Sequence, residues 1–154
     1  MKQYIGTKVI QAEPATKGQA AAKRIGLKVE DCPDTLAGMK EDGYRIIYPD
    51  GYESWSPKDV FEAAYRETTG MSFGLAIEAA KMGKKIARAG WNGKNQYVEL
   101  ASCISYKNSA GEVVNVGHDA IGNKALAFVG TSGVQIGWLA SQADMLADDW
   151  KILG

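Results

Sequence analysis

Short β-prone segments that end in turn residues recur along this chain, and they limit its fold more than any other feature. The clearest pair is YRIIY at 44–48 and YESWS at 52–56, which flank the turn signal PDG at 49–51. A second turn signal, NSAG at 108–111, leads from one β-prone segment into the next. Strands joined by turns this short run antiparallel. The sequence therefore predicts antiparallel hairpins.

Four short helices are indicated by serine or threonine residues that can cap them. Three of these residues have a polar partner three positions later, which is the pattern of a capping box. The expected caps are Thr16 with Gln19, Ser56 with Asp59, Ser141 with Asp144, and Ser72, which opens the segment FGLAIEAAKM. In that segment, apolar residues at helical spacing from Phe73 to Ala80 predict one buried face. Strands and helices in this order predict an α+β fold with a mostly antiparallel sheet and short helices.

The chain is expected to form two small units. Its 154 residues, 45% of them hydrophobic, are enough for one ordinary domain or two small ones. The segment ETTGM at 67–71 is polar, contains a glycine and is the favoured boundary. Residues 1–66 are expected to form a small α+β unit that opens with a strand over 3–13. Residues 71–154 are expected to form the second α+β domain, which closes with a strand at 149–153.

Charge and cysteine content argue against several classes of partner. The 18 basic and 18 acidic residues cancel, and residues 1–70 and 71–154 are each balanced to within one charge, whereas duplex-binding proteins carry a basic excess. Cys32 and Cys103 stand far apart and His118 is the only histidine, so no metal site is predicted. No apolar run approaches the ~18 residues of a membrane span. We expect no nucleic-acid polymer and no membrane as partner, reduced thiols, and a cytoplasmic location.

Known catalytic motifs are absent from the sequence. It contains no glycine-rich phosphate loop, no nucleophile elbow and no H-E-x-x-H zinc motif. His118 with Asp119 is the only acid–base candidate, and a lone loop histidine is more often structural or exposed. The adjacent Asp148 and Asp149 fit a solvated helix end better than a metal site. We expect no catalytic residue and no cofactor, with a nucleotide-processing enzyme as an alternative.

Two segments combine an aromatic residue with small polar groups. They are AGWNGK at 89–94 and GWLASQAD at 137–144, and together they supply indole faces, amides and a carboxylate. Gly90 and Gly93 can let backbone N–H groups approach an anion, and Arg88 can add charge-assisted bonds to phosphate. Stacking of a base on an aromatic ring contributes ~1–3 kcal/mol. These are the groups that a pocket for a small nucleotide requires.

Each of these residues also has a structural interpretation. Trp91 is either a core residue or a ring that a glycine-flanked turn presents to a ligand, and composition alone does not decide between the two. Trp138 and Trp150 can equally fill the core. Ser141 and Asp144 are accounted for as helix caps. A solvated strand face is the alternative for Lys84, Lys85 and Arg88.

The same two segments carry a resemblance to a known family. MSFGLAIEAAKMGKKIARAGWNGK at 71–94 and GWLASQADMLADDWKIL at 137–153 are similar to the phage Thoeris anti-defense proteins of the second type. The shared pattern is a helix after S/T-F-G, then G-K-K-[IV]-x-R-x-G-W-N-G-K, then a distant W-L-A-S-Q-x-D-M-L-A-x-D-W. GYRIIYPDGYESWSPKDVFEAAYR at 43–66 resembles an accessory domain of phage proteins, to which we attach no function.

The resemblance implies a binding protein and not an enzyme. Members of that family bind a cyclic nucleotide that a bacterial immune sensor makes, a glycocyclic ADP-ribose, and hold it away from its effector. Some members also bind cyclic dinucleotides, and they assemble as homotetramers with pockets between subunits. The ligand-stacking tryptophan of the family's G-W-N-G turn corresponds to Trp91. The expected ligand-binding residues are Trp91, Asn92, Phe73, Arg88, Trp138, Ser141, Gln142 and Asp144.

The chain departs from the family pattern in two places. It has the additional unit at 1–66, and its middle segment at 103–136, which is expected to line part of the pocket, is different. The hypothesis is a phage anti-defense protein that sequesters a small cyclic nucleotide as a homo-oligomer, a tetramer, in the cytoplasm of the bacterial host. The main alternative is a structural or protein-interaction module of a phage, in which the tryptophans serve an interface.

Overall fold

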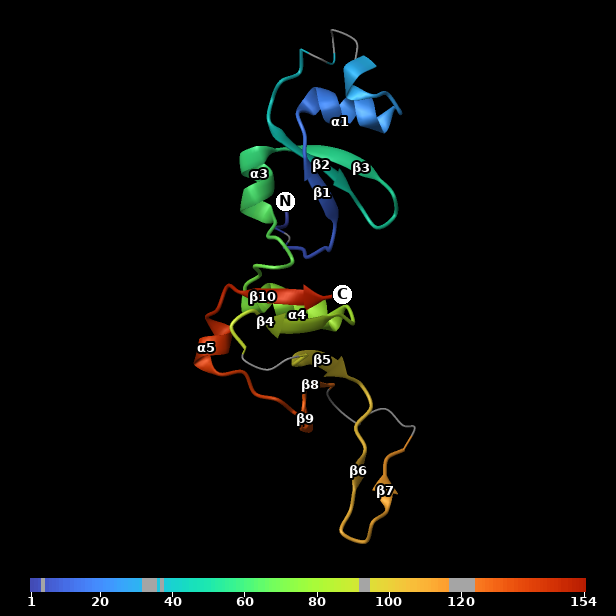
Figure 1. Cartoon of the computed structure of the whole chain (residues 1–154), viewed down its shortest axis with the longest axis vertical. Coiled ribbons are helices and arrows are strands. Elements are labelled where there is room, and N and C mark those ends of the chain that lie inside the picture. The colour runs from blue at the N-terminus through green and yellow to red at the C-terminus, as the bar shows by residue number, and fades with distance from the viewer. Residues whose placement is uncertain (4, 32–35, 37, 92–94, 117–123) are drawn as a thin grey trace. The chain divides into compact units, whose positions relative to one another are not determined.

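The computed structural model of the chain describes residues 1–3, 5–31, 36, 38–91, 95–116 and 124–154 (Figure 1). The chain divides into two compact units, Met1–Arg66 and Glu67–Gly154. Each combines antiparallel strands with short helices, which confirms the predicted α+β class. Within the described residues, no helix has the length and hydropathy needed to cross a bilayer.

The first unit is built on a three-stranded antiparallel sheet in the order β1-β2-β3. Its strands are β1 (Gln11–Pro14), β2 (Gly43–Ile47) and β3 (Glu53–Pro57). β2 and β3 form the predicted hairpin, in which Tyr44 lies opposite Ser56. Gly51 closes the turn with a φ of +83°, a conformation that glycine adopts without steric cost.

The helix α1 (Lys17–Arg24) begins at the predicted capping box. The Thr16 hydroxyl accepts the backbone N–H of Gln19 at 3.2 Å, and the Gln19 side chain accepts the backbone N–H of Thr16 at 2.9 Å. Two donors that the helix start would otherwise leave unpaired are thus satisfied. Gly26, with a φ of +75°, follows the helix end as predicted, and the 3₁₀ helix η1 (Val29–Asp31) comes next.

The strand predicted over residues 3–13 is wrong in its length. Among the described residues of this stretch, the strand is limited to Gln11–Pro14, because the partner strand β2 ends at Ile47, which lies opposite Gln11. Residues 5–10 therefore extend past the last residue that could pair with them. β-Propensity describes how a residue suits a sheet and does not say where its partner strand stops.

The cap predicted at Ser56 is also wrong. The next helix, α3 (Lys58–Ala64), has Pro57 at its N-cap, and no side-chain hydrogen bond is made there. Ser56 belongs to β3, where it is paired with Tyr44. The hairpin therefore runs directly into the helix, and strand pairing uses the residue that the capping pattern assigned to the helix start.

Aromatic contacts hold the elements of the first unit together. Phe61 of α3 stacks on Tyr44 of β2, with ring centroids 4.2 Å apart, and on Tyr65, at 4.9 Å. The indole N–H of Trp55 donates to the carbonyl of Ala15, just before α1, at 3.0 Å. The two helices are thus tied to the sheet by side chains of different strands.

Gly43 marks a position where the sheet leaves no room for a side chain. A Cβ there would lie 2.1 Å from the Ser56 carbonyl oxygen and 2.6 Å from the Trp55 ring. We expect Gly43→Ala to destabilise the first unit by ~1–3 kcal/mol, because the paired backbone cannot move aside. Gly6→Ala is the control, since a Cβ there meets no atom within 4 Å. Hydrogen exchange measured by mass spectrometry reports on each unit, and equal protection in the two variants would contradict the prediction.

The second unit is built on a five-stranded antiparallel sheet in the order β10-β4-β5-β8-β9. Its strands are β4 (Lys85–Arg88), β5 (Tyr97–Ala101), β8 (Ala125–Gly130), β9 (Gly133–Ile136) and β10 (Trp150–Leu153). β6 (Tyr106–Lys107) and β7 (Val113–Val114) form a separate hairpin that turns at 108–111, as predicted. The closing strand β10 pairs with β4.

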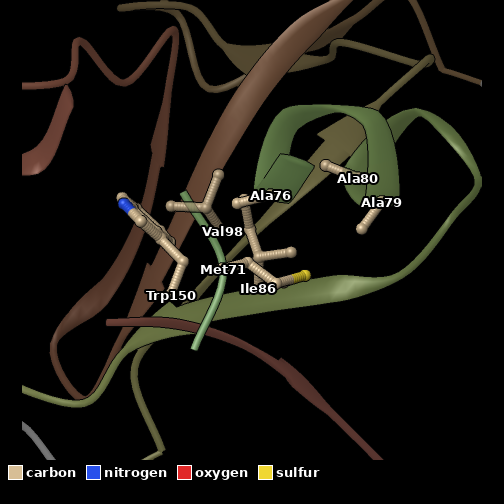
Figure 2. Close-up of a cluster of buried hydrophobic side chains, with 7 residues drawn as sticks. All are labelled: Met71, Ala76, Ala79, Ala80, Ile86, Val98 and Trp150. Atoms are coloured by element: carbon tan, nitrogen blue, oxygen red, sulfur yellow. The ribbon is translucent and has the colours of Figure 1, made fainter. Parts of the chain in front are cut away.

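A buried cluster joins this sheet to the helix α4 (Phe73–Lys81) (Figure 2). Ile86, Val98 and Trp150 are the largest fully buried side chains of the described chain. Ile86 lies opposite Val98, and Val98 lies opposite Phe128, so neighbouring strands present apolar side chains in one row. The helix contributes the small side chains of Ala76, Ala79 and Ala80.

The two predicted caps of the second unit both stand at N-cap positions. Ser72 precedes α4, but its side chain makes no cap hydrogen bond. Ser141 precedes α5 (Gln142–Met145) and forms a complete capping box. Its hydroxyl accepts the backbone N–H of Asp144 at 3.1 Å, and the Asp144 carboxylate accepts the backbone N–H of Ser141 at 3.2 Å. α5 therefore begins where the sequence predicts.

Candidate functional site

Four aromatic side chains of the second unit meet beside its buried core, and we call them the aromatic cluster. They are Trp91, which follows β4, Phe128 on β8, Trp138, which follows β9, and Trp150 on β10. The centroid of the Trp91 ring lies 5.4 Å from those of Phe128 and Trp150 and 6.0 Å from that of Trp138, with interplanar angles of 68°, 76° and 78°. Such edge-to-face contacts contribute ~0.5–1.5 kcal/mol each beyond the area they bury.

Sheet register and one glycine turn bring these rings together. Trp150, the first residue of β10, lies opposite Arg88, the last residue of β4. After β9, Gly137 turns the chain with a φ of +75°. The N–H groups of Gly137 and Trp138 both donate to the carbonyl of Leu126, each at 2.9 Å. Trp138 is thereby held beside β8.

The tryptophans of the cluster differ in their exposure. Trp150 is fully buried, which settles it as a core residue. Trp91 and Trp138 are partly buried and pack against the same core. Trp91 therefore has a packing role within its own unit and also keeps a solvent-accessible part. Three neighbouring rings fix its orientation.

Asp144 joins the aromatic cluster to α5. Its Oδ1 accepts the indole N–H of Trp91 at 3.3 Å and an Nη1–H of Arg88 at 3.0 Å. Its Oδ2 accepts the backbone N–H and the hydroxyl of Ser141 at 3.2 and 2.7 Å. Its backbone carbonyl accepts the indole N–H of Trp150 at 2.9 Å. Each carboxylate oxygen of Asp144 thus already receives two protein donors.

Asp149 holds the other side of Arg88. Its Oδ1 accepts the Nε–H of Arg88 at 2.8 Å, and its Oδ2 accepts the backbone N–H of Gly90 at 2.9 Å. Its backbone carbonyl accepts the N–H of Ala89 at 3.0 Å. We call Arg88 with Asp144 and Asp149 the carboxylate clamp. Their side chains are 20%, 14% and 34% exposed, so the clamp is shielded from water more than a surface ion pair is.

The clamp lowers the pKa of both carboxyl groups. For Asp149 the largest cause is the hydrogen bond from Arg88, which outweighs the opposing effect of burial. For Asp144, burial raises the pKa, but hydrogen bonds from Ser141, Arg88 and Trp91 outweigh it and hold the pKa below the usual value. The carboxylates in turn raise the pKa of the Arg88 guanidinium. At neutral pH the three groups are charged, and the clamp carries one net negative charge.

We expect Asp149→Asn to lower the free energy of unfolding of the second unit by ~1–2 kcal/mol at neutral pH, because Arg88 loses a charged partner. The folded-state pKa of Asp149 lies below its ordinary value of 3.8. The stabilisation is therefore present above that value and is lost as the pH falls through the folded-state pKa. Urea unfolding at a series of pH values should show that the free energy of unfolding falls less in acid for the variant than for the wild-type chain. Parallel pH profiles would contradict this.

The structure brings several of the predicted binding residues together, namely Trp91, Trp138, Arg88, Ser141 and Asp144. Phe73 contacts the group through Trp150, with ring centroids 5.5 Å apart. Gln142 is exposed in α5. The predictions that fall on Asn92, His118, Asp119 and Cys32 lie outside the described residues.

Sequence reasoning missed Phe128 and Asp149. Phe128 belongs to a β-prone segment in which Leu126 and Phe128 are two residues apart, and this period could have placed both on one sheet face. The interpretation of Asp149 as part of a solvated helix end is wrong, because its carboxylate pairs with Arg88. The two residues are 61 positions apart in the chain, so no local pattern links them.

The fold and the aromatic cluster together define the second unit as a small antiparallel α+β domain with a partly exposed aromatic site beside its core. Residues 71–153 match the family model of the Thoeris anti-defense 2-like domain. The chain is also 39% identical over 90 residues to Thoeris anti-defense 2 of Bacillus phage SP01, a match that covers 55% of this chain and 97% of that protein. The chain belongs to the Thoeris anti-defense 2-like family, which confirms the resemblance found in the sequence.

Proposed function

We propose that this chain is a phage anti-defense protein that binds a cyclic nucleotide immune signal and holds it without degrading it. Membership of the Thoeris anti-defense 2-like family supports the anti-defense role. The proposed ligand is of the glycocyclic ADP-ribose type, and cyclic dinucleotides are a second class. Residues 71–154 are the proposed binding domain, and residues 1–66 are an accessory unit.

The observation that carries this proposal is the partly exposed indole of Trp91 inside the aromatic cluster. Three rings and the hydrogen bond to Asp144 hold this indole in one orientation. A ring that is already ordered loses little conformational freedom when a base stacks on it, and such preorganisation raises affinity. Base stacking contributes ~1–3 kcal/mol.

Sequestration sets a requirement on affinity and none on turnover. A dissociation constant in the nanomolar range corresponds to about −12 kcal/mol. A stacked base, hydrogen bonds to neighbouring polar groups and a few charge-assisted contacts reach this value when the site is preformed. The proposed function therefore needs binding groups only, and we propose that the chain is not an enzyme.

We further propose a homo-oligomer, a tetramer, that acts in the cytoplasm of the bacterial host. The segment around α5 supports self-association, because several large apolar side chains along it are exposed. They are Leu139 at 88%, Leu146 at 79% and Met145 at 40% exposure. Contiguous exposed apolar patches mark protein interfaces, and we propose that these side chains contribute to one. Light scattering coupled to size-exclusion chromatography measures the mass of the assembly.

Isothermal titration calorimetry of the full chain tests the proposed ligand class. Glycocyclic ADP-ribose and a set of cyclic dinucleotides serve as ligands, and linear ADP-ribose serves as the control. We expect at least one cyclic ligand to bind at submicromolar concentration and linear ADP-ribose to bind more weakly. If the whole cyclic set fails to bind at micromolar concentration, the proposal is wrong.

A further inference from the structure

We infer that Arg88 is a positioning residue that orients residues 89–91, which we call the Trp91 turn, and that the ligand places an uncharged base, and not a phosphate, beside the carboxylate clamp. This inference rests on the proposed function, because it assigns parts of the ligand to parts of the site. It differs from the expectation that Arg88 binds phosphate directly.

The hydrogen bonds of Arg88 support a positioning role. Its Nε–H donates to Asp149, and Nη1 donates to Asp144 and to the Ala143 carbonyl, the last at 3.2 Å. Three of the five guanidinium N–H donors are thus used within the domain. Nη2 has no hydrogen-bond partner in the part of the chain that the structure describes, and a Cβ on Gly90 would come within 3.8 Å of it. The guanidinium therefore lies against the backbone of the turn that it supports.

The clamp also connects the turn to the carboxyl-terminal segment at several points. Asp149 receives N–H groups from Ala89 and Gly90, and Asp144 receives the indole N–H of Trp91. Arg88 bridges the two carboxylates. Both carboxylates lie within 3.0 Å of the guanidinium, so its loss would leave two negative charges near each other without the cation that bridges them, and like charges repel. The orientation of the Trp91 ring thus depends on Arg88 as well as on the three neighbouring rings.

The charge of the carboxylate clamp determines which part of a ligand can bind beside it. Within the clamp, two carboxylates face one guanidinium, so a phosphate placed against the clamp would meet a net negative charge. Lys85, three residues earlier, lies 4.6 Å from the centroid of the Tyr97 ring. Alternation along β4 puts it on the sheet face opposite Arg88, so it does not neutralise the clamp. An uncharged purine avoids the repulsion and stacks on the indole.

A double-mutant cycle on the full chain separates positioning from phosphate contact. We expect Arg88→Gln and Asp149→Asn each to weaken the binding of glycocyclic ADP-ribose about tenfold. The double variant should bind no more weakly than either single variant, because each of the three variants disrupts the same clamp. The slope of log Kd against log salt should equal that of the wild-type chain in each case. Lys85→Gln, which removes a positive charge from the same strand, is the matched control and should change neither quantity.

A direct phosphate contact would give a different pattern. Arg88→Gln alone would then weaken binding far more than Asp149→Asn, the losses would add in the double variant, and the salt slope would flatten because a screened charge contact is gone. That result would overturn the inference. If Arg88→Gln does not fold, Arg88→Lys replaces it, since lysine keeps the charge but loses the bidentate fork.

A measurement without ligand distinguishes failure of this inference from failure of the proposed function. Near-ultraviolet circular dichroism reports on the ordering of indole rings. Arg88→Gln should reduce the signal of the folded chain, and the same substitution in a Trp91→Phe background should change it little. An unchanged signal refutes the positioning role, whether or not a ligand binds. Absence of cyclic nucleotide binding by the wild-type chain refutes the proposed function and, with it, the placement of the base.

Discussion

Replacing Trp150 with alanine is expected to destabilise the second unit by ~3–5 kcal/mol, the range for deletion of a buried aromatic side chain. Trp150 is fully buried at the start of β10 and contacts the rings of Phe73, Trp91 and Trp138. Its loss also removes the indole donor from the Asp144 carbonyl. The cavity opens where the core and the candidate site meet, so stability and binding should fall together.

Hydrogen exchange measured by mass spectrometry follows the two units separately. In Trp150→Ala, protection should fall across Glu67–Gly154 and stay unchanged across Met1–Arg66. Trp150→Phe keeps an aromatic ring in the core and should lose less stability than Trp150→Ala. A stability within ~1 kcal/mol of the wild-type chain would contradict the assignment of Trp150 to the core.

Replacing Trp91 with alanine is expected to weaken ligand binding about 5- to 150-fold, which corresponds to the ~1–3 kcal/mol of one stacked base. The partly exposed ring of Trp91 is the proposed stacking surface. Trp91→Phe keeps an aromatic ring and loses the N–H that donates to Asp144, so it should bind more tightly than Trp91→Ala. Calorimetry with glycocyclic ADP-ribose compares the variants.

The same variant separates the proposed function from the main alternative. If the chain is a sequestering protein, Trp91→Ala should lose ligand affinity and keep the mass of the wild-type assembly. A protein-interaction module should instead dissociate, because its tryptophans serve an interface. Unchanged affinity together with unchanged mass would mean that Trp91 only packs the domain, and the assignment of the stacking ring would then be wrong.

Local signals predicted the elements that depend on neighbouring residues. The capping boxes at Thr16 and Ser141 and the turns at 49–51 and 108–111 each rest on contacts between residues a few positions apart. The same reasoning failed where strand pairing decided the outcome. Ser56 fitted both the β-prone segment at 52–56 and the capping pattern, and its pairing with Tyr44 of β2 decided in favour of the strand.

For the candidate site, too, the sequence predicted the local features and not the contacts between distant segments. Trp91 and Trp138 could be selected from the sequence because each stands in a short aromatic–polar segment next to glycine. Their meeting depends on the register of β4, β8 and β10, which the sequence does not state. The link between Arg88 and Asp149 also depends on that register, so a residue expected at a solvated helix end proved to support the turn.

Heat release followed by mass spectrometry tests the central claim most directly, namely that the chain holds a cyclic nucleotide without degrading it. The full chain is purified from bacteria that produce the immune signal, washed, heated to unfold it, and the released small molecules are identified. We predict recovery of an intact cyclic nucleotide of the glycocyclic ADP-ribose type, and little of it from Trp91→Ala treated in the same way. Recovery of a linear degradation product, or of no nucleotide, would contradict the account.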